Sequence, residues 1–409
     1  MEEIFIVGVG MTRFGKHRDR SVKSLVAEAV GNALSDANAQ QGDVGAAVFS
    51  NITQGIMEGQ HAIRGQVALR SMGFSEIPIV NVENACAGGA TALHQAAMML
   101  RAGLTDVALA IGVEKMHSDD KLKSSAIFDG GWDVHDLDAI AERLTAIGNG
   151  LSPPPGTPEG VRSPFMELYA SVTRGHMRMF GTTQEHLAAV ASKNHRHSTM
   201  NPLAQYQQDM SIEEVLNAPM IAWPLTLPMC SPISDGAAAA LLCTRAALSR
   251  FNDAAPVRLL STVLTSGSDR EWAEFDRHLC RKAAMKAYEE AGIGPSDVSV
   301  AEVHDASAFA EIIQVENLGF CEVGQGGWIA ARGETALGGR IPVNPSGGLE
   351  SKGHPISATG LGQIHELVTQ LRGRAGPRQV AGARIAVAEN GGGHHGVEEA
   401  AAVVTVLAA

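Results

Sequence analysis

The sequence predicts an α/β fold made of two similar halves, each with helices packed against a sheet. Helix, strand, glycine-rich turn, helix and strand follow one another in the same order near both ends of the 409-residue chain. Such a length exceeds one ordinary core and suits halves of roughly 150 residues each plus an insertion. Small side chains dominate, with 45 glycines and 4% aromatic residues. They let helices approach a sheet closely, which favours a layered body.

The first matched segments are a helix and the strand that follows it. Apolar periodicity predicts a helix over residues 24–37 and a strand over 46–50. The later counterparts are a helix over 281–292 and a strand over 299–303, which ends at His304. The same pair of elements therefore starts each half.

The second matched segments carry the residues that are best suited to catalysis. Cys86 opens a helix that runs to about residue 101, and His354 opens one that runs to about residue 372. The strands around these helices are expected over residues 77–82, 106–111 and 383–388. Cys86 and His354 thus occupy equivalent positions. A pseudo-twofold axis would bring their two helix N-termini together.

The repeat also suggests where the chain divides. Its last strands are expected over residues 235–242 and 398–404. We expect an N-terminal half over residues 1–255 and a C-terminal half over 256–409. Residues 115–222 have no counterpart in the second half and include a proline-rich loop signal. We interpret them as an inserted, partly helical region that covers the substrate.

Composition excludes several classes of protein. The net charge of −12 argues against a nucleic-acid or anionic-membrane surface, because both need clustered positive charge. The five cysteines lack close CxxC spacing, so neither a disulfide framework nor a metal site is indicated. The N-terminus is acidic and then strand-like, unlike a signal peptide, and no apolar run approaches the ~18 residues of a membrane span. We expect a cytoplasmic protein.

Cys86 is the candidate nucleophile. It lies where a strand gives way to a helix, so it faces the positive end of the helix dipole, which is expected to lower its pKa and form the thiolate. The glycines after it, Gly88 and Gly89, let a thioester come near without a side-chain clash. The alternative is a buried cysteine that behaves as a small hydrophobic side chain.

His354 is the candidate base. A helix N-terminus keeps an imidazole neutral, as a base must be, and the approach to His354 is rich in glycine. For an arbitrary Gly-His-Pro a capping histidine beside Pro355 would be the commoner case. The glycines favour a site.

His304 and Asp305 follow a predicted strand, and the carboxyl ends of strands in α/β sheets are where ligands meet polar groups. An imidazole there could donate to a thioester oxygen and stabilise an enolate. The alternative is a satisfied histidine that packs the turn.

Residues 390–396, Asn-Gly-Gly-Gly-His-His-Gly, close another strand and offer exposed backbone N–H groups suited to an oxyanion. His394 and His395 are candidates for proton transfer. They are weak metal ligands, because neighbouring side chains usually diverge and partners at metal spacing are missing.

Basic side chains in the insertion are candidates for contact with the phosphates of a nucleotide-like ligand, although surface solvation would explain any single one. They are Arg174, Arg178, Lys193 and Arg196. Arg196 stands between His195 and His197, and we expect this triplet on a solvated or anion-facing helix end.

Several of these segments together make the chain resemble the thiolase superfamily, and within it the sterol-carrier-protein or lipid-transfer type, over essentially its whole length. Their counterparts in that family are the nucleophile segment, the pantetheine-side loop, the strand-end His-Asp motif and the Gly-rich histidine loop. In this sequence they are residues 84–89, 231–238, 302–305 and 344–349 with 353–355 and 358–360. The resemblance implies the thiolase fold, in which two α/β halves form αβαβα layers with an inserted loop domain.

The resemblance also implies roles for individual residues. Cys86 would take the acyl group, His354 would activate it, and His304 would help form the oxyanion hole for the enolate. The backbone N–H groups of Gly392 and Cys86 would form a second hole. The residues that it implies on the substrate or coenzyme A side are Ser231, Gly347 and Gly348, and Arg196 joins them as a candidate because of its charge.

This chain departs from the family in one catalytic respect. Family members commonly use a second cysteine as acid/base, but Asn390 and Ala306 stand at the two places where it is found. Another group would have to move that proton, or the substrate must make the transfer easier. The candidate groups are His394, His395, Asp305 and Glu389.

The resemblance implies an acyl-CoA C-acyltransferase that cleaves or forms a carbon–carbon bond of a 3-oxoacyl-CoA, bulky or substituted, through an acyl-Cys86 intermediate. Coenzyme A would be a co-substrate, with no permanently bound cofactor. Relatives with such changes, among them the large subunit of benzoylsuccinyl-CoA thiolase, associate with a small zinc-ribbon/OB-fold protein. We therefore expect a homodimer and such a partner subunit. The alternatives are a retro-aldol lyase or C-acetyltransferase with that partner, and a non-catalytic acyl-CoA-binding subunit.

Overall fold

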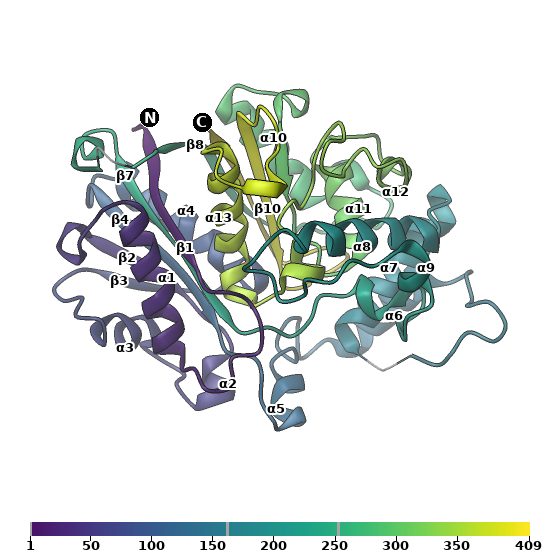
Figure 1. Cartoon of the computed structure of the whole chain (residues 1–409). Coiled ribbons are helices and arrows are strands. Elements are labelled where there is room, and N and C mark those ends of the chain that lie inside the picture. Colours follow the sequence, from purple (N-terminus) through teal and green to yellow (C-terminus); the bar gives the residue numbers. More distant parts are fainter. Residues whose placement is uncertain (1, 161–162, 252–253) are drawn as a thin grey trace.

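A computed structural model describes residues 2–160, 163–251 and 254–409 of the chain. Its main sheet has nine strands in the order β3-β2-β4-β7-β1-β8-β11-β10-β9. Helices cover the outer faces of this sheet, and further helices lie between its two halves (Figure 1). The predicted α/β class is confirmed.

The elements alternate as the repeat predicts. The first part contains β1 Ile4–Met11, α1 Val22–Asp36, β2 Ala46–Ser50, α2 Gln54–Glu58, α3 Arg64–Arg70, β3 Ile79–Val82, α4 Gly88–Arg101 and β4 Val107–Glu114. The predicted insertion contains α5 Lys121–Ala126, α6 Leu137–Gly148, α7 Pro164–Phe180, α8 Gln184–Ser198, α9 Ile212–Leu216 and β5 Met220–Ala222. A short strand, β6 Leu225–Thr226, follows it and pairs with β5.

The rest of the chain returns to the sheet. It contains β7 Gly236–Thr244, β8 Val257–Ser266, α10 Leu279–Ala291, β9 Val300–Glu302, α11 Ala308–Asn317, α12 Gly326–Ala331, α13 Thr359–Leu371, β10 Ile385–Gly392 and β11 Ala401–Ala408. β1 pairs with β8 only over Ile4 to Ile6, and this short ladder joins the two halves of the sheet. The division of the chain at residue 255 stays a prediction.

Three apolar cores separate the layers. The middle core holds side chains of α4 and α13 together with strands of both halves of the sheet, such as Val48 and Ala386. One outer core packs α1 and α3 on the first half, and the other packs α10 and α11 on the second half. Strand β4 shows why: Leu109 faces one core and Ala110 the other, since successive side chains of a strand point to opposite faces. The layers therefore run α, β, α, β, α, as expected.

Two boundaries differ from the predictions and matter for the site. β10 does not end at Ala388 but continues to Gly392, because Gly391 and Gly392 still pair with β11. His354 does not open α13 directly, since a 3₁₀ turn over Ile356–Ala358 stands between His354 and the start of the helix. The predicted strand over 46–50 has the predicted bounds.

Gly112 on β4 fixes how closely the His354 segment can lie on the sheet. A Cβ atom at this glycine would lie 2.0 Å from the carbonyl oxygen of Ser357. We expect Gly112→Ala to lower the free energy of unfolding by about 3 kcal/mol, because the turn before α13 must shift. Chemical denaturation measures this value. Gly31→Ala is the matched control: it has no heavy atom within 4 Å and should stabilise α1 by up to about 1 kcal/mol. Equal effects of the two substitutions would contradict the close contact.

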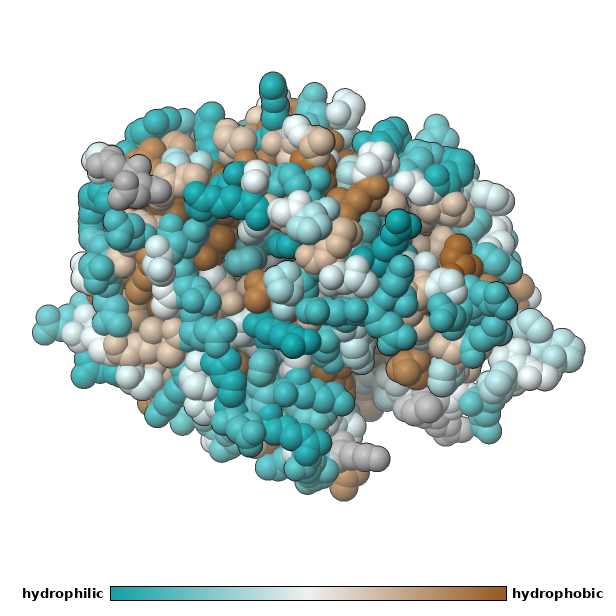
Figure 2. Space-filling model, in the orientation of Figure 1, coloured by the Kyte–Doolittle hydropathy of each residue, from teal (hydrophilic) through white to brown (hydrophobic). Residues whose placement is uncertain are grey.

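The surface is mostly hydrophilic on the face that Figure 2 shows, with apolar residues scattered over it. Among the described residues, no helix is both long and apolar enough to cross a membrane.

Candidate active site

Three separate loops bring Cys86, His304 and His354 together. Cys86 lies in the 3₁₀ turn before α4, His304 lies two residues after the end of β9, and His354 stands in the loop before α13. One ligand atom of each side chain lies within 4.8 Å of the others. The two imidazole rings meet edge to face, with centroids 5.2 Å apart. The structure thus joins a thiol and two imidazoles from distant parts of the sequence.

The backbone around Cys86 is pressed against the end of β10. A Cβ atom at Gly392 would lie 2.3 Å from the carbonyl oxygen of Asn84 and 2.9 Å from the backbone nitrogen of Cys86. Only glycine therefore fits at position 392, because any side chain would collide with this turn. The backbones of Gly392 and Cys86 lie side by side.

The predicted thiolate of Cys86 is wrong for the resting protein. Burial raises the pKa of the Cys86 thiol to about 12, and this outweighs the hydrogen bond from the Gly393 backbone, which lowers it. The carboxylate of Glu114 raises the pKa further. Loss of solvation is larger here than the benefit of the helix end. The thiol therefore needs a base before it can attack a substrate.

His354 is arranged as that base. Its Nδ1 lies 2.7 Å from Oγ1 of Thr359, and this hydroxyl donates its own proton to the carbonyl of Pro355. Nδ1–H must then be the donor to Thr359, which leaves Nε2 with a free lone pair. Burial holds the pKa of His354 well below its usual value, and the neighbouring His304 lowers it further. The prediction of a neutral imidazole agrees with this lowered pKa. The largest cause is burial, whereas the sequence argument relied on the helix N-terminus.

The ring of His304 lacks hydrogen-bond partners among the described residues at both of its nitrogens, and both are buried. Burial lowers the pKa of His304 to about 4, so the ring is neutral at pH 7. A buried polar group usually has a partner. The free ring nitrogens beside Cys86 and His354 are thus suited to a polar atom of a ligand.

Glu389 supports His304 from behind the strand. Its Oε2 accepts the backbone N–H of His304 at 3.0 Å, and its Oε1 accepts the thiol of Cys280 at 3.4 Å. Burial raises the pKa of Glu389 to about 8, and the nearby Glu399 adds to the rise. A carboxyl group next to the site therefore keeps its proton in neutral solution.

This raised pKa predicts how stability depends on pH. Between the usual glutamate pKa of about 4.3 and the folded value near 8, the folded state holds a proton that the unfolded chain has lost. The free energy of unfolding should therefore fall as pH rises through this window, by on the order of 5 kcal/mol from this residue. Denaturation of wild type and Glu389→Gln at pH 5 and pH 9 measures it.

The glutamine variant should show a flatter dependence on pH than the wild type. Glu290→Gln, at an exposed position on α10, is the control and should keep the wild-type slope. A slope unchanged by Glu389→Gln would contradict the protonated carboxyl.

Asn390 and His394 lie near this centre but outside the cluster of thiol and imidazoles. The Asn390 side chain faces the start of α13, where its Oδ1 would lie 2.4 Å from a Cβ atom at Gly360, and it has no hydrogen-bond partner among the described residues. His394 donates its backbone N–H to Gly131, and burial lowers its pKa to about 4. His395 is exposed.

The loop of Ser231 reaches the site from the other side. The Ser231 backbone N–H donates to Ala306, and Oγ of the nearby Ser234 accepts the backbone N–H of His354 at 2.9 Å. Gly347 and Gly348 are buried, with φ of 103° and 60°. A Cβ atom at Gly348 would lie 2.0 Å from Asp305. The structure gives these glycines a close packing contact, and their contact with substrate stays a prediction.

The triplet around Arg196 is only partly solvated. Arg196 is exposed on α8, whereas His195 and His197 are buried and hydrogen-bonded to the loop that precedes α13, so the solvated interpretation of these two is wrong. Lys193 pairs with Glu311 and is not free for a phosphate. α8 packs against the Gly-rich loop, and this contact buries one side of the helix.

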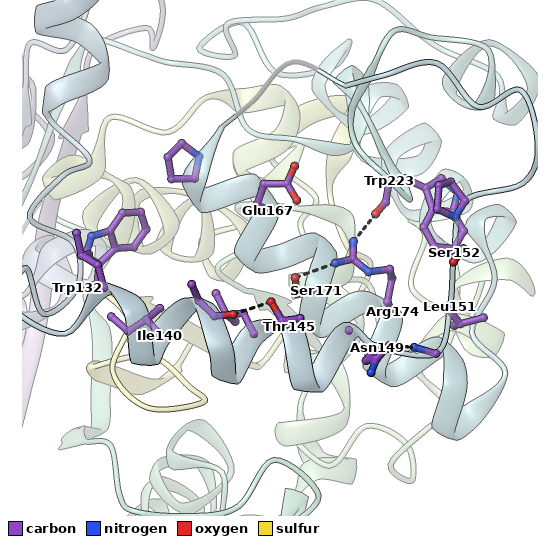
Figure 3. A pocket seen from close by; sticks show the side chains of 17 residues that line it. Trp132, Ile140, Thr145, Asn149, Leu151, Ser152, Glu167, Ser171, Arg174 and Trp223 are labelled. Carbon is purple, nitrogen blue, oxygen red and sulfur yellow. Dashed lines mark hydrogen bonds between the residues drawn. The ribbon is translucent and has the colours of Figure 1, made fainter.

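A hollow of about 690 Å³ lies between α6, α7 and the loop after α6. Figure 3 shows Arg174 in it, bonded to the Trp223 carbonyl at 2.8 Å and to Ser171 at 2.9 Å. Trp132 lines one end. The carbonyl of the preceding residue, Gly131, lies 3.4 Å from a Cβ atom placed at Gly393. The hollow therefore begins beside the glycine loop but does not contain the thiol or the two imidazoles.

The sequence interpretation did not single out some polar residues around this centre. They are His278, Cys280 and Glu399, while Glu389 was one of several alternatives. A usable signal was present, because Glu389 interrupts the apolar run of β10 and Glu399 lies two residues before β11. A carboxylate in a strand buried on both faces is rarely accidental.

Comparison with known proteins identifies the family. Residues 4–215 match the family described as "Thiolase, N-terminal domain", and residues 263–407 match "Thiolase C-terminal domain-like". The chain is similar to acetyl-CoA acetyltransferase of Methanothermobacter thermautotrophicus, with 37% identity over 97% of this chain and 98% of that protein. It is 38% identical to sterol carrier protein 2 of Bos taurus, over 95% of this chain and 69% of that protein.

A further relative is benzoylsuccinyl-CoA thiolase subunit BbsB of Thauera aromatica, with 34% identity over 92% of this chain and 91% of the relative. Among solved structures, the Ltp2-ChsH2(DUF35) aldolase has the same fold, with a TM-score of 0.77 and 24% identity over 100% of this chain and 98% of the other. Both halves of the sequence match, and so does the fold. The chain belongs to the thiolase family of acyl-CoA acyltransferases.

Proposed function

We propose that the protein cleaves or forms a carbon–carbon bond of a 3-oxoacyl-CoA through an acyl group carried on Cys86. The observation that carries this proposal is the buried thiol of Cys86 grouped with the neutral rings of His304 and His354. A nucleophile next to a base is the arrangement that covalent catalysis requires.

Each residue has a distinct part in this proposal. Nε2 of His354 takes the proton of the Cys86 thiol, which then attacks the 3-oxo carbon. The neighbouring N–H groups of Gly392 and Cys86 hold the oxyanion that forms there. A ring nitrogen of His304 donates to the thioester oxygen of the enolate. The Glu389 contact with the His304 backbone keeps that ring in place.

The substrate is proposed to be bulky or substituted. The hollow beside Trp132 has room for such an acyl group, since it begins next to the glycine loop of β10. Coenzyme A enters as a co-substrate along Ser231, Gly347 and Gly348, and the exposed Arg196 meets its phosphates.

A retro-aldol lyase is the second candidate. It is favoured by Asn390 and Ala306, which replace the cysteines that family members commonly use for proton transfer. In that reaction Cys86 forms no covalent bond to the substrate. The two candidates therefore differ in whether an acyl-enzyme exists.

We further propose a homodimer in the cytoplasm that works with a small zinc-ribbon/OB-fold subunit. The likeness in fold to the Ltp2-ChsH2(DUF35) aldolase, whose name includes a second component, supports the search for such a partner.

Intact-protein mass spectrometry tests the main proposal. The protein is incubated with a panel of acyl-CoA and 3-oxoacyl-CoA esters, and the added mass is mapped by peptide digestion. An acyl adduct on Cys86 is the expected result, and its mass identifies the acyl class. Carbon–carbon cleavage without any adduct would overturn the covalent mechanism in favour of the lyase.

A further inference from the structure

Cys86, His304 and His354 form a donor set of the kind that holds zinc in proteins. One ligand atom of each side chain lies within 4.8 Å of the other two. A tetrahedral zinc ion with a sulfur at about 2.3 Å and two nitrogens at about 2.1 Å keeps these donors roughly 3.5 Å apart. Small rotations of the three side chains close the difference. Among the described residues, no fourth histidine, cysteine or carboxylate joins the group, so one coordination position stays open.

The ring of His354 is already oriented as a metal ligand. Its Nδ1 lies 2.7 Å from Oγ1 of Thr359, and this hydroxyl donates its own proton to the carbonyl of Pro355. Histidines that bind metals usually donate their other ring N–H to an oxygen, and this bond fixes both the ring and its tautomer. Thr359 therefore does for His354 what an outer-shell partner does at a metal site, and the lone pair of Nε2 is left for the ion.

His304 gives a second and independent sign of a ligand. The residue is only 3% exposed, yet neither of its ring nitrogens has a hydrogen-bond partner among the described residues. Its ring meets that of His354 edge to face, with centroids 5.2 Å apart. A buried polar group without a partner is costly. A metal ion that bonds to a nitrogen of this ring removes that cost.

Cys86 decides which metals the group selects. A thiol and two imidazoles suit zinc and similar transition metals, whereas magnesium and calcium prefer oxygen donors. Binding releases the proton of the Cys86 thiol to the solvent, and the resulting thiolate balances part of the charge of the ion. Because Cys86 is only partly buried, an ion can reach its sulfur from outside.

A second group of candidate ligands is already engaged in hydrogen bonds. We call His278, Cys280, Glu389 and Glu399 the network behind β10. Nδ1 of His278 accepts the backbone N–H of Cys280 at 3.2 Å, so Nε2 carries the ring proton, 3.5 Å from Oε2 of Glu399. The Cys280 thiol donates to Glu389 at 3.4 Å. This imidazole has no free lone pair for a metal, unlike that of His304.

We propose that Cys86, His304 and His354 bind a zinc ion that holds the resting enzyme in a reversible, inactive state. The ion occupies the sulfur of the nucleophile and the lone pair of the base at once, so acylation of Cys86 must wait for its release. Zinc and the acyl-CoA substrate therefore compete for the same sulfur. The binding rests on the geometry of the three side chains, and the inhibition rests on the proposed acyl-Cys86 reaction.

Equilibrium dialysis of the whole, untagged chain against Zn²⁺ tests the binding without any substrate. We expect one zinc ion per chain, and an affinity at least about 10²-fold weaker in Cys86→Ala. Thr359→Val should weaken it by about 10- to 100-fold, the usual effect of losing an outer-shell partner. Cys280→Ala is the matched control: it removes a thiol from the network behind β10 and should bind zinc as the wild type does.

Co²⁺, which takes the same tetrahedral sites as Zn²⁺, gives a second reading on the wild type itself. A sulfur-to-cobalt charge-transfer band is expected in the absorption spectrum, and added Zn²⁺ should remove it. This reading needs no substitution, so it decides the matter even if Cys86→Ala folds poorly.

Zinc should also block the acyl adduct on Cys86, and a chelator should restore it. Absence of stoichiometric zinc binding would overturn the inference, and so would binding that Cys280→Ala abolishes and Cys86→Ala keeps. An adduct that forms at the wild-type rate on zinc-saturated protein would overturn the inhibition. Absence of an adduct in zinc-free protein would instead overturn the proposed function and leave the zinc site standing.

Discussion

Cys86→Ala is expected to lower kcat for carbon–carbon cleavage by at least about 10⁴-fold, because it removes the atom that would carry the acyl group. The side chain is small and partly buried, so alanine should leave the fold intact. Steady-state kinetics with the ester that acylates the wild type measures the loss. The residual rate reports what the two imidazoles and the oxyanion holes achieve without the thiol.

Cys321→Ala is the matched control, since it removes another partly buried free thiol from a site outside the cluster. It should keep wild-type activity and the adduct. If Cys86→Ala retained more than about a tenth of the activity, covalent catalysis would be untenable and the lyase would stand.

The pattern of the sequence placed these candidate residues correctly relative to one another. The repeat predicted that the turn of Cys86 and the loop of His354 meet, and they do, with His304 beside them. Such positions can be predicted because they stand at strand ends and helix starts, which a fold brings to one edge.

The charge state of Cys86 could not be predicted in the same way. A helix end is visible in the sequence, but the burial that raises the pKa of the thiol comes from packing of several distant segments. The same limit applied to His195 and His197, whose burial depends on how α8 lies on the Gly-rich loop.

The network behind β10 was largely hidden for a different reason. Cys280 lies on α10, Glu389 on β10 and Glu399 in the connection before β11, and they share no spacing rule. Their approach depends on the register of β10 with β11. Glu389 was a candidate only because it precedes the glycine run, while its partner Cys280 could be identified only from the structure.

His354→Ala should lower the rate of Cys86 acylation at pH 7 by about 10³-fold and change its dependence on pH. The wild type should be nearly independent of pH from 7 to 9, because the pKa of His354 lies well below this range and Nε2 is already free. Without the imidazole, the thiolate must form by loss of its proton to solvent. Since the pKa of the thiol is about 12, the rate of the variant should rise roughly tenfold per pH unit up to pH 9.

Stopped-flow acylation across this pH range makes the measurement, with His135→Gln at an exposed position as the control that keeps the wild-type profile. A variant that loses the same factor at every pH would show that His354 acts by holding the loop and not by taking the proton.

His304→Ala distinguishes the roles of the two rings. It should slow carbon–carbon cleavage yet leave acylation by a simple acyl-CoA nearly intact, since His304 is proposed to act on the enolate and not on the thiol.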